Sequence, residues 1–92
     1  MEIGDVVLSL RGRDQGRLFL VVGQSLDRVL VTDGDLRPVT KPKAKNPRHV
    51  AAAGRLREAE RERLRQGPKP GDDEVRRWLQ DLQEGGDADA EG

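Results

Sequence analysis

The sequence predicts a mainly β fold: a small antiparallel barrel followed by two short α-helices and a disordered acidic tail. Four short apolar segments, separated by turns rich in glycine and aspartate, lie within residues 3–39 with no helical pattern between them, which is typical of a small barrel. Beyond about residue 50 the chain changes to helix-forming residues. Hydrophobic residues make up only 34% of the chain, against 37% charged, so the core is expected to occupy part of the length.

The first three strands follow from the apolar runs. Ile3–Leu10 and Leu18–Val22 are rich in valine and leucine, and Arg28–Thr32 alternates in character, so each run predicts a strand. The first two runs are apolar at adjacent positions, which predicts central strands that are buried on much of both faces. Between the second and third strands we expect a polar turn with Leu26 pointing inward.

The next segments predict the closing part of the barrel. Asp33–Gly34 is a typical two-residue hairpin turn, which places a fourth strand at Asp35–Val39, and Pro38 makes this an edge strand or a strand end. Thr40–Pro47 is rich in proline and lysine, which favours an extended connector. Arg48–Val50 is expected to add a short fifth strand.

Two helices are predicted in the C-terminal half. Gly54–Gln66 has helix-forming residues with a thin apolar face, supported by Glu–Arg pairs. Asp72–Gln83 has a clear apolar stripe, where we expect the single tryptophan to pack rather than to stack on a base. The stripe consists of Val75, Trp78, Leu79 and Leu82. The expected organisation is a barrel at 1–50, a two-helix extension at 51–84 and a disordered acidic tail at 85–92.

From the residue types we expect no enzymatic function. The chain has no cysteine and one histidine, His49, so thiolate chemistry and sites with several imidazoles are ruled out. Asp33 and Asp35 flank a turn glycine and are read as turn residues. We therefore expect no catalytic residue, metal, cofactor or small-molecule substrate. Since no apolar run approaches the roughly 18 residues of a membrane span, we expect a cytoplasmic protein without a membrane partner.

The charge distribution favours a phosphate-rich partner. The net charge is zero, but residues 1–50 hold nine Lys/Arg against six Asp/Glu, and residues 36–57 hold no acid. The predicted loop Arg11–Arg17 carries three arginines. Loop charges alone are usually just solvated, but two basic segments in one small fold predict a positive face that binds nucleic-acid phosphates.

The N-terminal half resembles a KOW motif, which consists of two apolar strands joined by a loop with a glycine near its end. The residues that carry the resemblance are Gly4, Val6–Val7, Gly12, Asp14, Gly16 and Arg17, continued by Val29–Leu30–Val31 and Asp33–Gly34. Over Met1–Val50 the chain is similar to small bacterial KOW-domain RNA-binding proteins, which are related to the fourteen-e family of large-subunit ribosomal proteins. The position before Gly16, often lysine in such proteins, is Gln15 here.

This resemblance implies an SH3-like barrel that binds RNA, in particular ribosomal RNA, as a ribosomal or ribosome-associated protein, with ribosomal proteins as possible further partners. From the basic segments and the resemblance together, the expected RNA-binding residues are Arg11, Arg13, Gln15, Gly16, Arg17, Arg37, Lys41, Lys43, Lys45 and Arg48. The alternative is a protein-interaction adaptor that uses the barrel and the amphipathic helix at 72–83.

Overall fold

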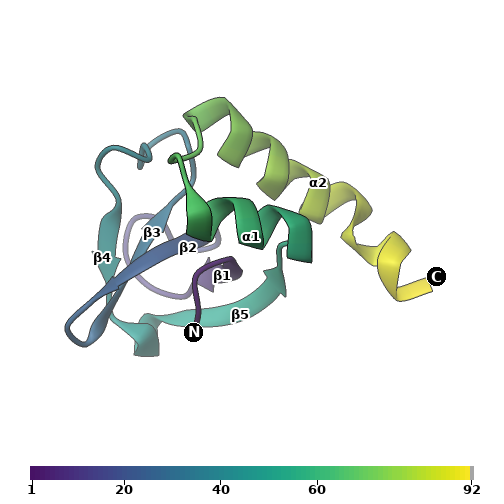
Figure 1. Cartoon of the computed structure of the whole chain (residues 1–92). Helices are drawn as coiled ribbons and strands as arrows, with labels where there is room; N and C mark the ends of the chain where they lie inside the picture. Colours follow the sequence, from purple (N-terminus) through teal and green to yellow (C-terminus); the bar gives the residue numbers. More distant parts are fainter. Residues whose placement is uncertain (92) are drawn as a thin grey trace.

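Five antiparallel strands form one sheet, with two α-helices packed beside it (Figure 1). This computed structural model describes the backbone of residues 1–91 and the side chains of residues 1–84. The sheet order is β4-β3-β2-β1-β5, so the mainly β prediction is confirmed. The elements are β1 (Asp5–Ser9), β2 (Leu18–Ser25), β3 (Arg28–Thr32), β4 (Lys43–Lys45), the 3-10 helix η1 (Pro47–His49), β5 (Val50–Arg55), α1 (Glu58–Gln66) and α2 (Asp72–Glu91).

Strands β1 and β2 are buried on both faces, as their apolar runs predict. Val6 pairs with Leu20 and Val7 pairs with Phe19 across the ladder, and all four side chains are at most 1% exposed. Because alternate side chains point to opposite faces, Val6 and Leu20 join the helices in one cluster, while Val7 and Phe19 belong to a second. The second cluster is completed by Val21, Val29, Val31 and Val50.

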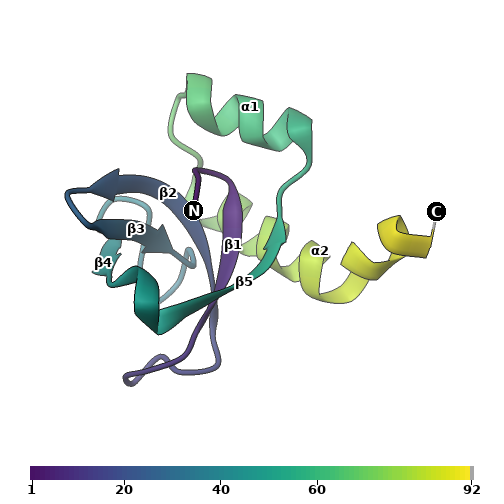
Figure 2. The same ribbon diagram turned by 90° about the horizontal axis from the view of Figure 1, so that it is seen from below.

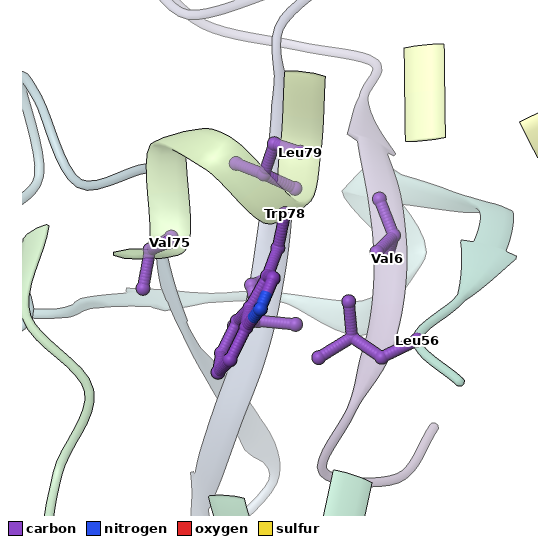
Figure 3. Close-up of a cluster of buried hydrophobic side chains, with 6 residues drawn as sticks. Val6, Leu56, Val75, Trp78 and Leu79 are labelled. Carbon is purple, nitrogen blue, oxygen red and sulfur yellow. The ribbon is translucent and has the colours of Figure 1, made fainter. Parts of the chain in front are cut away.

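Helix α2 covers one face of the sheet with the apolar stripe that its sequence predicts. Val75, Trp78 and Leu79 are at most 8% exposed, and they pack with Val6 of β1 and with Leu56, which follows β5 (Figure 3). The predicted packing role of Trp78 is therefore confirmed. The stripe is covered by the chain's own sheet, so it does not face solvent.

The predicted fourth strand at Asp35–Val39 is wrong, since β4 lies within the expected connector. The Asp33 carboxylate accepts hydrogen bonds from the backbone N–H groups of Asp35 and Arg37, both at 2.9 Å. The hydroxyl of Thr32 also donates to the Arg37 carbonyl. These side-chain bonds use the backbone groups that a ladder would need, so residues 33–37 form a loop closed by Asp33 instead of a hairpin.

The predicted helix start at Gly54 is also wrong, because residues 50–55 form β5. Ala51 and Ala52 favour helices on their own, but here they pair with Leu8 and Val7 of β1, and tertiary pairing overrides this weak preference. A Cβ on Gly54 would lie 2.8 Å from Cδ2 of Leu82, so the small residue lets α2 approach the strand. The sheet therefore continues past the boundary expected at residue 50.

The turn between β2 and β3 corrects the expectation for Leu26. Ser25 pairs with Arg28, which leaves Leu26 and Asp27 alone at the tip of the hairpin. Leu26 is fully exposed at 101% and has a positive φ of 56°. The tip extends past the sheet, where no neighbouring element covers it, so the side chain faces solvent instead of the core.

Helix α2 is longer than expected. It continues past Gln83 to Glu91, into the segment 85–92 that the sequence predicts as a disordered tail, while Gly92 lies outside the described residues. Within the described part of the chain, no helix combines the length and apolar character needed to cross a membrane.

Candidate nucleic-acid interface

The arginine-rich loop, residues 10–17, projects from the end of β1 and β2 on the side away from α1 (Figure 2). Its base is closed by two backbone hydrogen bonds: Ser9 donates to Arg17 at 2.9 Å, and Gly16 donates to Ser9 at 2.8 Å. Gly16 has a φ of +89°, and no atom lies within 4 Å of the position that a Cβ would take. Positive φ therefore explains this glycine, and close approach within the chain does not.

A buried ionic cluster fixes the loop to β4. The Asp14 carboxylate accepts hydrogen bonds from Ser9 Oγ at 2.7 Å, Lys45 Nζ at 2.8 Å and Lys43 Nζ at 3.1 Å. Lys45 Nζ also donates to the Arg11 carbonyl at 3.0 Å. Asp14 and Lys45 are 8% and 6% exposed. We call Ser9, Asp14, Lys43 and Lys45 the Asp14 clasp; it holds the loop in one shape.

The clasp sets the protonation of Asp14. Burial on its own would raise the pKa of the carboxyl, but the hydrogen bonds from Lys45, Ser9 and Lys43 outweigh this effect and hold the pKa well below its usual range. Asp14 is therefore ionised at neutral pH, and its negative charge compensates the positive charges of the two lysines beside it.

A second ionic contact joins the arginine-rich loop to the loop after β3. Arg17 Nη2 lies 3.2 Å from Oδ2 of Asp33 and 3.7 Å from Oδ2 of Asp35. This cluster leaves one net negative charge, while Asp14 with its two lysines leaves one net positive charge. The two ionic clusters thus cancel, and the positive character of this end of the molecule comes from other side chains.

Five exposed cations supply that charge, and among the side chains of residues 1–84 none has an ion-pair partner. Contacts of the arginine-rich loop bring some of these cations near one another. The Leu10 N–H donates to the His49 carbonyl at 2.8 Å, which brings the loop beside η1 and Arg48, and Arg13 lines the same hollow as Arg37. Lys45 reaches Arg11 from β4. We call these residues the cationic loop face: Arg11, Arg13, Arg37, Lys41 and Arg48.

The predicted site residues divide into three groups. The members of the cationic loop face are exposed, as are Gln15 and Gly16. Arg17 is exposed too, but it is held by carboxylates. Lys43 is half-buried and Lys45 is buried, so these two lysines hold the loop from inside. In β4 the two lysines share a strand face, but the sequence predicts this segment as a connector and does not show that the lysines point inward.

Helix α2 supports the loop that carries Arg37. The backbone N–H of Val39 donates to Asp72 Oδ1 at 2.8 Å, and the Arg76 guanidinium donates to the Gly34 carbonyl. Sequence analysis missed this support, because the contacts join residues far apart in the chain and no local pattern marks them.

Replacing Gly34 with alanine tests this support. Gly34 has a φ of +74°, and a Cβ there would overlap the Asp72 carbonyl oxygen and lie 3.1 Å from Arg76 Cγ. We expect Gly34→Ala to lower the free energy of unfolding by about 2–4 kcal/mol, from backbone strain and overpacking combined. Gly16→Ala is the matched control, because it has a similar φ but open space, and should cost about 1 kcal/mol. Urea denaturation measures both, and equal losses would contradict the helix contact.

Comparisons with known proteins give no relative from which a function can be transferred. No protein-family model matches the chain, and no curated protein matches it significantly. Across the described residues, no group of three or more His, Cys, Asp or Glu side chains is arranged to hold a metal ion. The case for function therefore rests on the geometry and charge of the site.

Proposed function

We propose that this protein is a non-enzymatic RNA-binding protein that binds the phosphate backbone of structured RNA with the cationic loop face. The observation that carries the proposal is a set of five exposed cations, four on loops and Arg48 on η1, which have no ion-pair partner among the side chains of residues 1–84. Arginine side chains donate paired hydrogen bonds to phosphate oxygens. Loops that are already ordered lose little conformational entropy when they bind.

The fold supports a more specific proposal, an SH3-like barrel of the KOW type. The chain returns so that β5 lies beside β1, and η1 joins it to β4 at the other end of the sheet order. The loop between β1 and β2 ends in a glycine of positive φ, at the place where the KOW resemblance expects one. On this proposal ribosomal RNA is the first candidate ligand, and the protein acts in the cytoplasm as a ribosomal or ribosome-associated translation factor.

The adaptor alternative loses its main support. It relied on the apolar stripe at 72–83 as a free surface for a partner's groove, but Val75, Trp78 and Leu79 are buried against the chain's own sheet. RNA bases have no exposed aromatic side chain to stack on, because the chain has no tyrosine and its single tryptophan and single phenylalanine are both buried. Contacts to the phosphate backbone are therefore the expected mode.

Charge reversal at the loop tests the proposal. We expect Arg13→Glu to weaken binding to a fluorescently labelled RNA hairpin by about tenfold or more, because it removes a charged hydrogen bond and adds repulsion. Arg77→Glu is the matched control: it makes the same change in net charge on the exposed side of α2 and should leave the affinity within about twofold. Fluorescence anisotropy at one salt concentration measures all three proteins. Equal weakening by both variants would show that only overall charge matters, against the assigned face.

A further inference from the structure

A hollow of about 360 Å³ lies between the arginine-rich loop and the loop after β3, beside Arg13 and Arg37 of the cationic loop face. This volume falls at the lower end of the range for small-ligand sites. Four cations line it together with the Asp14 carboxylate and two apolar side chains. The cations are Arg13, Arg17, Arg37 and Lys43, and the apolar side chains are Phe19 and Leu36.

Two of the four cations are free to bind a ligand. Lys43 is held by Asp14 at 3.1 Å, and Arg17 is held by Asp33. Arg13 and Arg37 come from different loops, are exposed, and have no ion-pair partner among the side chains that the structure describes. The hollow therefore presents two separate guanidinium groups. Together they can bind two phosphate groups, such as the phosphates on either side of one nucleotide.

An apolar side chain on the rim is the second observation. Leu36 is an apolar residue between two charged residues on a loop, and its side chain is 65% exposed. The loop is rigid at this point, since the Asp33 carboxylate binds the N–H groups of Asp35 and Arg37 on either side of it. Leu36 is thus held at the hollow with its side chain exposed. An apolar side chain does not bind phosphate, so this residue indicates a ligand that also has an apolar part.

From these two observations we infer that the hollow receives one unstacked nucleotide of the RNA. This inference rests on the proposed RNA binding and names the substrate class of the same surface: RNA with an unpaired nucleotide in or beside a stem. Arg13 and Arg37 bind the phosphates on either side of that nucleotide, and its base lies against the exposed side chain of Leu36. A continuous stem keeps its bases stacked inside the helix, so it leaves the hollow empty.

Two RNA hairpins with the same stem, one of which carries a single bulged nucleotide, test this inference by fluorescence anisotropy. The wild-type protein is expected to prefer the bulged hairpin by about fivefold, the contribution of one partly buried apolar contact. Leu36→Ala should reduce this preference to less than about twofold and leave the affinity for the continuous stem unchanged. Leu26→Ala, which truncates an exposed leucine outside the hollow, should keep the full preference.

The outcomes separate this inference from the proposed function. If the wild type binds both hairpins with equal affinity, the nucleotide site is overturned while RNA binding stands. A preference that survives Leu36→Ala also overturns it, because the bulge is then bound elsewhere. If neither hairpin binds at any salt concentration, the proposed function and the nucleotide site are both overturned.

Discussion

Replacing Trp78 with alanine is expected to lower the free energy of unfolding by about 3–5 kcal/mol, the usual cost of deleting a large buried aromatic side chain. Trp78 is 8% exposed and packs in the cluster that covers Val6 and Leu20, which are completely buried. Small domains are stabilised by only about 5–15 kcal/mol in total. For a domain of this size the expected fall in Tm is at least about 12 °C.

Circular dichroism measures this loss, because the variant no longer contains the tryptophan that fluorescence would follow. Trp78→Phe retains much of the apolar surface and should lose less stability. Leu26→Ala removes a fully exposed leucine and should change stability by no more than about 0.5 kcal/mol. Truncation after Gly67 removes α2 entirely and should abolish the cooperative unfolding transition. An unchanged Tm for Trp78→Ala would contradict the docking of α2 on the sheet.

Replacing Asp14 with alanine is expected to cost a similar amount, about 3–5 kcal/mol, because it leaves the buried ammonium group of Lys45 without its counter-charge. The effect should be larger than that of any exposed ion pair in the molecule, such as Arg65 with Glu62, which contributes about 0–1 kcal/mol. Urea denaturation at neutral pH measures the difference.

A double variant tests whether the buried charge is the cause. Asp14→Ala combined with Lys45→Met removes both buried charges, and replacing a buried pair by apolar groups is often nearly neutral. The double variant should therefore recover much of the stability that Asp14→Ala loses. If the loss of stability in the double variant equals the sum of the losses caused by Asp14→Ala and Lys45→Met alone, the two residues do not act as a pair.

The same clasp predicts a dependence on pH. The pKa of Asp14 is depressed in the folded state, so its contribution to stability is fully present above the unfolded pKa of about 3.9. The contribution is lost as the pH falls from there toward the depressed folded pKa, because the unfolded chain then binds the proton first. The difference in stability between wild type and Asp14→Asn should therefore shrink below about pH 4. A constant difference across this range would exclude the ionised carboxylate as its source.

The sequence predicts correctly those parts of the fold that depend on the order of apolar residues within a single segment. Arg28–Thr32 is a strand with the predicted bounds, β1 and β2 have two buried faces, and the stripe of α2 is buried. The two buried faces of β1 and β2 follow from continuous apolar runs. The third strand and the stripe of α2 follow from periodicities of two and 3.6 residues, which fix the face that a side chain occupies.

The errors lie where distant contacts outweigh local preference. The residues after Ala51 have helical preference but pair with β1. The loop after β3 is a different case, because the Asp33 side chain binds backbone N–H groups only two and four residues later and so prevents a hairpin. A distant contact also explains Lys45: its charge predicted an exposed RNA contact, but a carboxylate 31 residues earlier draws it into the interior. A charged side chain can be buried when its partner is present, and the sequence does not show that Asp14 is the partner.

The salt dependence of RNA affinity tests the proposed function most directly. Each phosphate contact contributes about −0.7 to −0.9 to the slope of log affinity against log salt concentration. If the five cations of the cationic loop face each bind a phosphate, the wild-type slope for an RNA hairpin should be about −4, and Arg13→Ala should reduce its magnitude by a little less than one. An affinity independent of salt, or an unchanged slope for Arg13→Ala, would contradict the proposal that this face binds RNA.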